Sequence, residues 1–152
     1  MRLNARVDYA LRAVAELASV ASGADGPVTA ERLAKGQSIP PKFLESILLQ
    51  LRRAGIVVSQ RGPEGGYWLA RPAKEITLAD IIRAIDGPLA NVRGQRPENV
   101  GYHGAAAALQ EVWIALRASE RQILELVTIA DVSTGKLPKR IRALASDPAA
   151  WS

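Results

Sequence analysis

Residues 61–72, RGPEGGYWLARP, decide how the rest of this chain is interpreted. Three glycines, a proline and a glutamate separate Arg61 from the aromatic pair Tyr67–Trp68. The flanking runs, IVVSQ at 56–60 and YWLA at 67–70, are rich in β-branched and aromatic residues. The pattern predicts a β-hairpin with a six-residue loop that is nearly free of bulky side chains. Taken alone, it is an ordinary glycine-rich turn, so its meaning depends on its neighbours.

Two helices are expected immediately before the hairpin. Thr29 is placed to cap a short helix that KGQSI at 35–39 ends, and Pro41 suits the first position of the next helix. Gly55 suits the C-terminal turn of that second helix. Its apolar residues predict a buried stripe of Phe43, Leu44, Ile47, Leu48 and Leu51. The residues left facing outward are Lys42, Glu45, Ser46, Gln50, Arg52 and Arg53. A short helix, a turn and a polar-faced helix are typical of a helix-turn-helix.

A hairpin that follows a helix-turn-helix is a wing, and its tip must lie close to a phosphate backbone. Glycines remove side-chain bulk there and permit a positive φ. Arg61 supplies positive charge and could enter a narrow minor groove. Tyr67 and Leu69 are expected to anchor the hairpin, with Trp68 on its opposite face.

Two more helices complete the N-terminal unit. The first is expected from an apolar face at Leu3, Val7, Leu11, Val14 and Leu17, and ASGADGP at 21–27 ends it. The second is EITLADIIRAIDGP at 75–88, with a capping pair of Thr77 and Asp80. Its inward residues are Leu78, Ile81, Ile82 and Ile85. The predicted fold class is mainly α with a small β-hairpin wing, and residues 1–88 form a winged helix-turn-helix domain.

The remaining residues divide into a loop, a long helix and a tail. Residues 89–104 lack periodicity, and a loop of that length is usually functional or mobile. Residues 105–132 are expected to form a long helix to about Val127 and a short one that Thr128 caps. The tail at 133–152 carries Lys136, Lys139, Arg140 and Arg142, and either touches DNA or is a solvated end.

The long helix carries an apolar stripe that a second copy of the chain would cover most economically. The predicted dimerisation residues are Leu109, Val112, Trp113, Leu116, Ile123 and Leu126, and Ser119 interrupts the seam. The alternative is that the stripe folds back onto its own domain.

Composition limits the possible functions. The 152 residues carry a formal charge of +5 with a pI near 10.0, which suits a polyanionic partner. Cysteine is absent and His103 is the single histidine, so disulfides and thiolate chemistry are excluded. RGPEGG lacks the Lys-Ser/Thr ending of a nucleotide-binding P-loop. The sequence therefore predicts no enzyme. With no long apolar run and no secretory signal, it also predicts a cytoplasmic protein without a membrane partner.

Four segments carry a family resemblance. They are MRLNARVDYALRAVAELA at 1–18, IPPKFLESILLQLRRAGIV at 39–57, RGPEGGYWLARPAKEITLADIIRAIDGPL at 61–89 and LVTIADV at 126–132. The chain resembles the Rrf2 family of bacterial regulators, which includes IscR, NsrR and CymR. The resemblance implies a winged helix-turn-helix homodimer that binds a near-palindromic operator, usually as a repressor. It implies DNA contacts at or near Arg2, Ser38, Pro41, Lys42, Glu45, Arg52, Arg61, Gly62, Gly65 and Gly66. Pro40 stands where the family often has a serine, so the operator need not follow that of relatives.

The chain departs from many members of this family in the loop at 89–104. Relatives hold an iron–sulfur cluster there through three cysteines, whereas this chain has none and Gly94 follows PLANVR. Asp8 matches an acidic cluster ligand of some relatives and is expected to be a salt-bridging helix residue instead. We therefore expect no cofactor. A small-molecule effector, a protein effector and constitutive repression all remain open. A different class of function is a protein-interaction module that uses an exposed Trp68.

Overall fold

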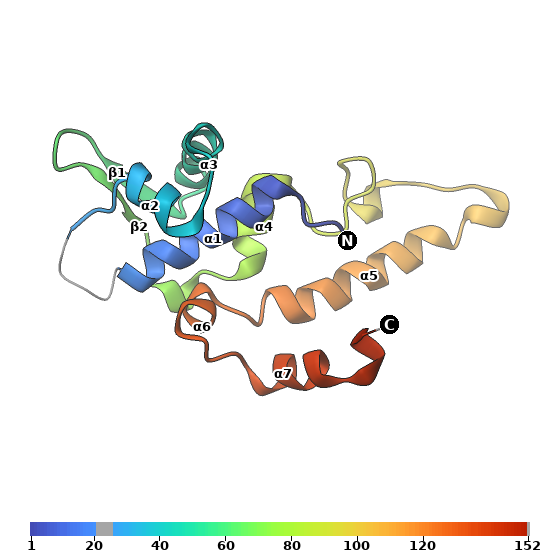
Figure 1. Cartoon of the computed structure of the whole chain (residues 1–152). Helices are drawn as coiled ribbons and strands as arrows, with labels where there is room; N and C mark the ends of the chain where they lie inside the picture. Colours follow the sequence, from blue (N-terminus) through green and yellow to red (C-terminus); the bar gives the residue numbers. More distant parts are fainter. Residues whose placement is uncertain (21–25, 152) are drawn as a thin grey trace.

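Seven α-helices and one antiparallel hairpin make up the computed structural model, which describes residues 1–20 and 26–151 (Figure 1). The helices are α1 (Ala5–Val20), α2 (Ala30–Gln37), α3 (Pro41–Arg53), α4 (Leu78–Asp86), α5 (Leu109–Leu124), α6 (Ile129–Thr134) and α7 (Lys139–Ser146). The strands are β1 (Val57–Gln60) and β2 (Gly66–Leu69). The expected fold class, mainly α with a small hairpin, is confirmed. Most of the turn expected at 21–27 lies outside the described residues.

Helix α1 lies at the centre of the N-terminal unit and packs against α2, α3, α4 and α6. Val7, Val14 and Leu17 are buried, as their spacing predicts. Leu3 was expected on the same face, but it precedes the helix and is 57% exposed. The reason is a cap: the amide of Val7 donates to the Asn4 side-chain oxygen at 3.0 Å, so the helix begins after Asn4.

Helices α2 and α3 form the expected helix-turn-helix, with two corrections. The amide of Arg32 donates to the Thr29 hydroxyl at 3.2 Å, which confirms that cap. Helix α2 continues through Gln37 and ends only at Ser38, whose φ of 52° is left-handed. Phe43, predicted to be buried, is 48% exposed. The buried stripe of α3 is narrower than expected and consists of Leu44, Ile47, Leu48 and Leu51. The Phe43 ring instead lies 6.1 Å from that of Tyr9.

The hairpin pairs Val57 with Leu69 at its base and Gln60 with Gly66 at its tip. A third segment, missing from the sequence prediction, joins its other edge. The Val28 amide donates to the Tyr67 carbonyl at 2.8 Å, and the Tyr67 amide donates to the Val28 carbonyl at 2.7 Å. This bridge ties the hairpin to the start of α2. A single residue in a β-bridge shows no hydrophobic periodicity, so the sequence does not predict this contact.

Helices α4 and α6 begin in the same way and lie side by side at their starts. Both have the full capping box, Thr77 with Asp80 and Thr128 with Asp131. The Leu78 amide donates to the Val127 carbonyl at 3.0 Å, and the Ile129 amide donates to the Ile76 carbonyl at 2.8 Å. Ile129 is fully buried in the same core as α1. The chain thus returns to the N-terminal unit after α5.

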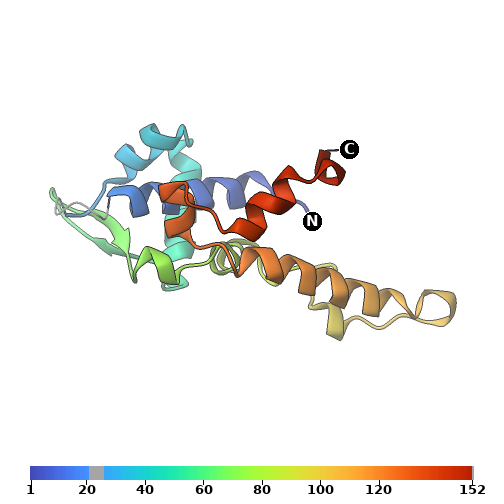
Figure 2. The ribbon, with the colours of Figure 1, turned by 90° about the horizontal axis from the view of Figure 1, so that it is seen from below.

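Helix α5 extends away from this unit as an arm (Figures 1 and 2). It begins at Leu109 rather than at residue 105, because Gly104–Ala106 forms a 3-10 turn that starts with a φ of 56° at Gly104. The tail contains a helix that the sequence did not predict, α7, which is almost entirely exposed. The Arg140 guanidinium donates to the Gln122 amide oxygen at 2.7 Å and so links α7 to α5. No described helix has the length and hydropathy to cross a bilayer.

The return of α6 into the core predicts a stability difference between two residues of one short helix. Ile129→Ala removes a fully buried side chain and is expected to lower the free energy of unfolding by about 2–5 kcal/mol. Val132→Ala, at a position 40% exposed, is the matched control and should change it by less than about 0.5 kcal/mol. Urea denaturation followed by circular dichroism measures both. Equal effects would contradict the placement of α6 in the core.

Candidate nucleic-acid interface

The solvent side of α3 presents a polar strip near its N-terminus. Lys42 and Glu45 are exposed on successive turns. Further along, Arg6 of α1 donates to the Ser46 hydroxyl at 2.9 Å and also to the Gln50 side-chain oxygen. These contacts occupy two outward residues of α3 and fix its rotation on α1. The predicted contact residues Lys42 and Glu45 therefore lie on the strip that faces solvent.

The turn before α3 is rigid and lacks a side-chain cap. Ser38 is exposed in its left-handed conformation, and Ile39 behind it is buried. Pro40 occupies the N-cap position without a capping hydrogen bond, and Pro41 begins the helix. Two successive prolines restrict this turn and hold Ser38 and Pro41 at the start of the exposed strip.

Arg52 connects the helix to the hairpin. Its guanidinium donates to the Ser59 hydroxyl of β1 at 3.3 Å, so this predicted DNA contact lies where α3 meets β1. Ile56, between the two elements, is 2% exposed and its amide donates to the Leu51 carbonyl at 3.0 Å. The helix and the hairpin are consequently held in one fixed orientation.

The hairpin tip projects beyond the helices, with Arg61 exposed on it (Figure 1). A Cβ atom at Gly65 would lie 2.2 Å from the Gln60 carbonyl oxygen, and one at Gly66 would lie 2.5 Å from the Val28 carbonyl oxygen. These two glycines are therefore required by the protein's own backbone. Gly62, with φ of 107° and open space around it, serves the turn itself and lies exposed beside Arg61.

Arg2 is separated from the other predicted DNA contacts. It lies before the N-terminal end of α1, the end remote from the hairpin, as Figure 1 shows. The structure thus brings Arg52 and the hairpin residues together beside α3, and leaves Arg2 apart from them.

The predicted dimer stripe is exposed along one side of α5. Leu109, Val112, Leu116 and Ile123 expose between 39% and 52% of their surface, and Leu126, just beyond the helix, exposes 41%. Trp113 differs from the rest of the set. It is half-buried, and its indole N–H donates to the Tyr102 hydroxyl at 3.1 Å, so it faces the loop at 89–104.

That loop is fastened to α5 rather than free in solvent. Pro97 and Val100 are buried, and the Gln110 amide donates to the Val100 carbonyl at 2.9 Å. Glu98 pairs with Arg117 of α5. The pKa of Glu98 is lowered, chiefly by its hydrogen bond with its own backbone amide and further by the neighbouring Arg117 and Arg96.

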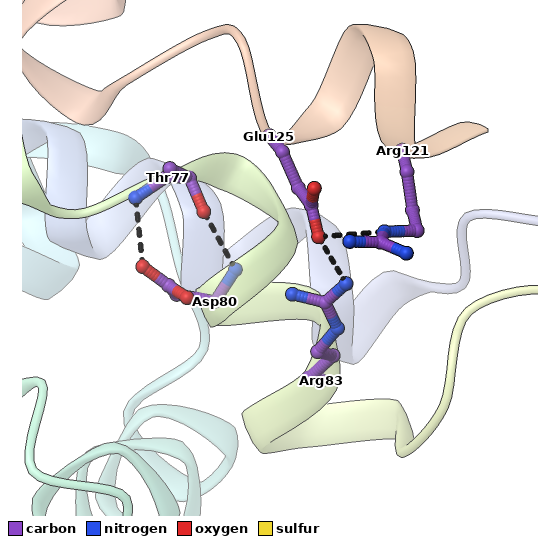
Figure 3. A network of polar contacts seen from close by, with 5 residues as sticks. All are labelled: Thr77, Asp80, Arg83, Arg121 and Glu125. Carbon is purple, nitrogen blue, oxygen red and sulfur yellow. Dashed lines mark hydrogen bonds and ion pairs between the residues drawn. The ribbon is translucent and has the colours of Figure 1, made fainter. Parts of the chain in front are cut away.

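An ion-pair network joins the arm to the N-terminal unit at the end of α5 (Figure 3). Arg83 of α4 and Arg121 of α5 donate to the same Glu125 oxygen, at 2.6 and 3.0 Å. These two guanidinium groups lower the pKa of Glu125, with Arg83 contributing most. The Thr77–Asp80 capping box lies one turn away in α4. The network fixes where the arm leaves the unit.

A family model described as an iron-dependent transcriptional regulator, Rrf2, matches residues 3–135. The chain belongs to the Rrf2 family. A Mycobacterium tuberculosis protein named as an HTH-type transcriptional regulator, Rv1287, is 50% identical over 97% of this chain and 90% of its own length. The HTH-type regulator CymR of Bacillus subtilis is 31% identical, covering 88% of this chain and 91% of that protein.

Solved structures of Rrf2 regulators have the same architecture. The structure of CymR, the global cysteine regulator of B. subtilis, superposes with a TM-score of 0.73 at 29% identity, over 90% of this chain and 99% of that one. T. potens IscR gives 0.69 at 26% identity, over 100% of this chain and 97% of IscR. The sequence-based assignment of the family is confirmed, and the chain is a transcriptional regulator with a winged helix-turn-helix.

The iron of the family description does not fit this chain's residues. Iron–sulfur clusters are held mainly by thiolates, and the chain contains no cysteine. Among the described residues, no three histidine, aspartate or glutamate side chains gather in a metal-binding group. Asp8 forms an ion pair with Arg12 at 2.9 Å, as a salt-bridging helix residue would.

The Glu125 network predicts a pH-dependent contribution to stability. A carboxylate whose pKa is depressed in the folded state stabilises the protein above its ordinary pKa near 4.5, and this contribution disappears as the pH falls through the lower folded-state value. Glu125→Gln should therefore melt below wild type at pH 7, and the gap should narrow below about pH 4.5. Glu111→Gln, at an exposed position of α5, is the control. A pH-independent gap in scanning calorimetry would contradict this ion-pair role.

Proposed function

We propose that this Rrf2 regulator is a sequence-specific repressor that binds a near-palindromic operator as a homodimer, without an iron–sulfur cluster. The observation that carries the proposal is the fixed placement of the exposed strip of α3 beside a hairpin that bears Arg61. An α-helix fits the major groove of B-DNA, and a slender basic hairpin suits the adjacent backbone or minor groove. Repression then requires only that the bound dimer occupies promoter DNA.

Lys42 and Glu45 have the chemistry for reading bases. A lysine donates to guanine O6 and N7, and a glutamate accepts from the cytosine amino group. Ser38, Pro41 and Arg52 border this strip and would contact phosphates or the groove edge. Arg61 and Gly62 would contact the backbone at the wing, while Gly65 and Gly66 shape it. Arg2 lies apart from these residues, so any contact that it makes with DNA would be at a separate position.

The exposed stripe of α5 supports the homodimer. Its spacing of three and four residues is that of a helix–helix seam, and a second copy presents the same stripe in return. A two-fold dimer places two copies of α3 on one face of the DNA, with half-sites about 34 Å, or one helical turn, apart. This symmetry is the reason to expect a near-palindromic operator.

One observation favours a second candidate, a protein-interaction module. Trp68 is 38% exposed on β2, and exposed aromatic residues are common at protein interfaces. Selection of bound duplexes from a random pool distinguishes the two functions. An enriched sequence with two inverted half-sites supports the regulator that binds an operator. A pool without enrichment, together with a stable complex with another protein, would replace it with the second candidate.

Arg61→Ala tests the wing on a duplex obtained from that selection. Loss of one phosphate contact should weaken binding and reduce the slope of log K against log salt concentration by about 0.9. Arg93→Ala removes one exposed positive charge from the loop at 89–104 and is the charge-matched control. Fluorescence anisotropy across a salt series gives both slopes. An unchanged slope for Arg61→Ala, or an equal reduction for the control, would remove the wing from the proposed interface.

Leu116→Glu tests whether the exposed apolar stripe of α5 is the dimer interface. A charge in the centre of an apolar interface should dissociate the dimer, because both copies would bury an unpaired carboxylate. Light scattering should give twice the chain mass of 16.3 kDa for wild type and the single mass for the variant. Ile114→Glu alters another face of the same helix at a position 37% exposed, and should remain dimeric. A dimeric Leu116→Glu variant would place the interface elsewhere.

A further inference from the structure

A small cavity lies where the N-terminal segment, α1 and α4 meet α5. Its volume is about 240 Å³. Val7 of α1, Ile82 of α4 and Leu89 of the following loop contribute buried apolar walls. Glu120 reaches this cavity from α5. None of these residues belongs to the α3 strip, the hairpin or the exposed stripe of α5.

Glu120 is physically anomalous. It is 8% exposed, and both of its carboxylate oxygens are buried without a hydrogen-bond partner among the described residues. It is also the only charged side chain that those residues bury. A buried carboxylate is unfavourable unless it is paired, and buried polar groups in folded proteins nearly always have partners. The carboxylate therefore points to a partner that enters the cavity.

The lining indicates the chemistry of that partner. A hard metal ion needs about six oxygen ligands, and no group of three candidate metal-ligating side chains occurs among the described residues. The walls of Val7, Ile82 and Leu89 instead suit an alkyl chain. At the rim, exposed Asp86 adds a second carboxylate, and exposed Arg2 and Met1, the residue with the terminal amino group, carry the opposite charge. The volume lies below the roughly 300–1,000 Å³ of drug-sized pockets, so the partner is small.

We propose that this cavity binds a small organic cation, an alkylammonium or alkylguanidinium, whose charged group pairs with Glu120. Its alkyl chain packs against Val7, Ile82 and Leu89. Such a ligand would contact α1 and α4 on one side and α5 on the other, and would stabilise the arm in its present position because it binds the folded state. The ligand site itself does not depend on DNA binding; only an effect on operator affinity would rest on the proposed function.

Titration calorimetry on the full chain, without DNA, tests the site directly. The probes are n-butylammonium chloride and n-butylguanidinium chloride, with sodium butyrate as the anion of matched chain length. Both cations should bind and butyrate should not. Glu120→Gln keeps the side-chain shape and should weaken cation binding about ten-fold or more, the effect of losing a charge-assisted hydrogen bond. Glu111→Gln, exposed on the same helix, should bind as wild type does.

Several results would overturn the site. Absence of binding by both cations to wild type is one, and it needs no variant. Equal binding of butyrate and butylammonium is another, as is unchanged affinity in Glu120→Gln. Light scattering of Glu120→Gln tests whether a second subunit, rather than a ligand, is the partner of this carboxylate. A shifted monomer–dimer equilibrium without any cation binding would assign the carboxylate to a contact between subunits. Failure of operator selection would leave these measurements unaffected, so the two proposals fail independently.

Discussion

Burial of one helix governs the arrangement of the whole N-terminal unit. Helix α1 buries its apolar face against four other helices, and the hydrophobic effect stabilises all of these contacts. The helix that presents Lys42 and Glu45 is one of the four, and Arg6 of α1 sets its rotation through Ser46 and Gln50. The exposed face of α3 is therefore a consequence of what its other face buries.

The hairpin depends on a second constraint, which is purely backbone. Two short hydrogen bonds between Val28 and Tyr67 place the chain so close to β2 that a side chain at Gly66 would collide with the Val28 carbonyl. The glycines that suggested close approach to DNA thus have an intramolecular reason as well. Packing of the protein against itself and presentation of Arg61 are achieved by the same residues.

Sequence patterns predicted the elements whose signals are local. Side-chain chemistry within a few residues predicts the caps at Thr29, Thr77 and Thr128, the proline at the start of α3 and the apolar stripe of α5. Some of the failures have a non-local cause. Burial of Phe43 depended on which side of a wide stripe faces α1, and the bridge at Val28 depends on a partner about forty residues away. Glu120 gave no signal, because a glutamate on an amphipathic helix is ordinarily solvated.

The paired starts of α4 and α6 have a consequence for how the chain is made. Ile129 completes a core that otherwise consists of residues before 86, and the segment between them leaves the unit as the arm and comes back. During synthesis, the N-terminal unit lacks part of its core until the ribosome has released α6. A nascent chain that stops short of this point leaves α3 and the hairpin in a unit with an incomplete core, and we expect that unit to be less stable than the intact protein.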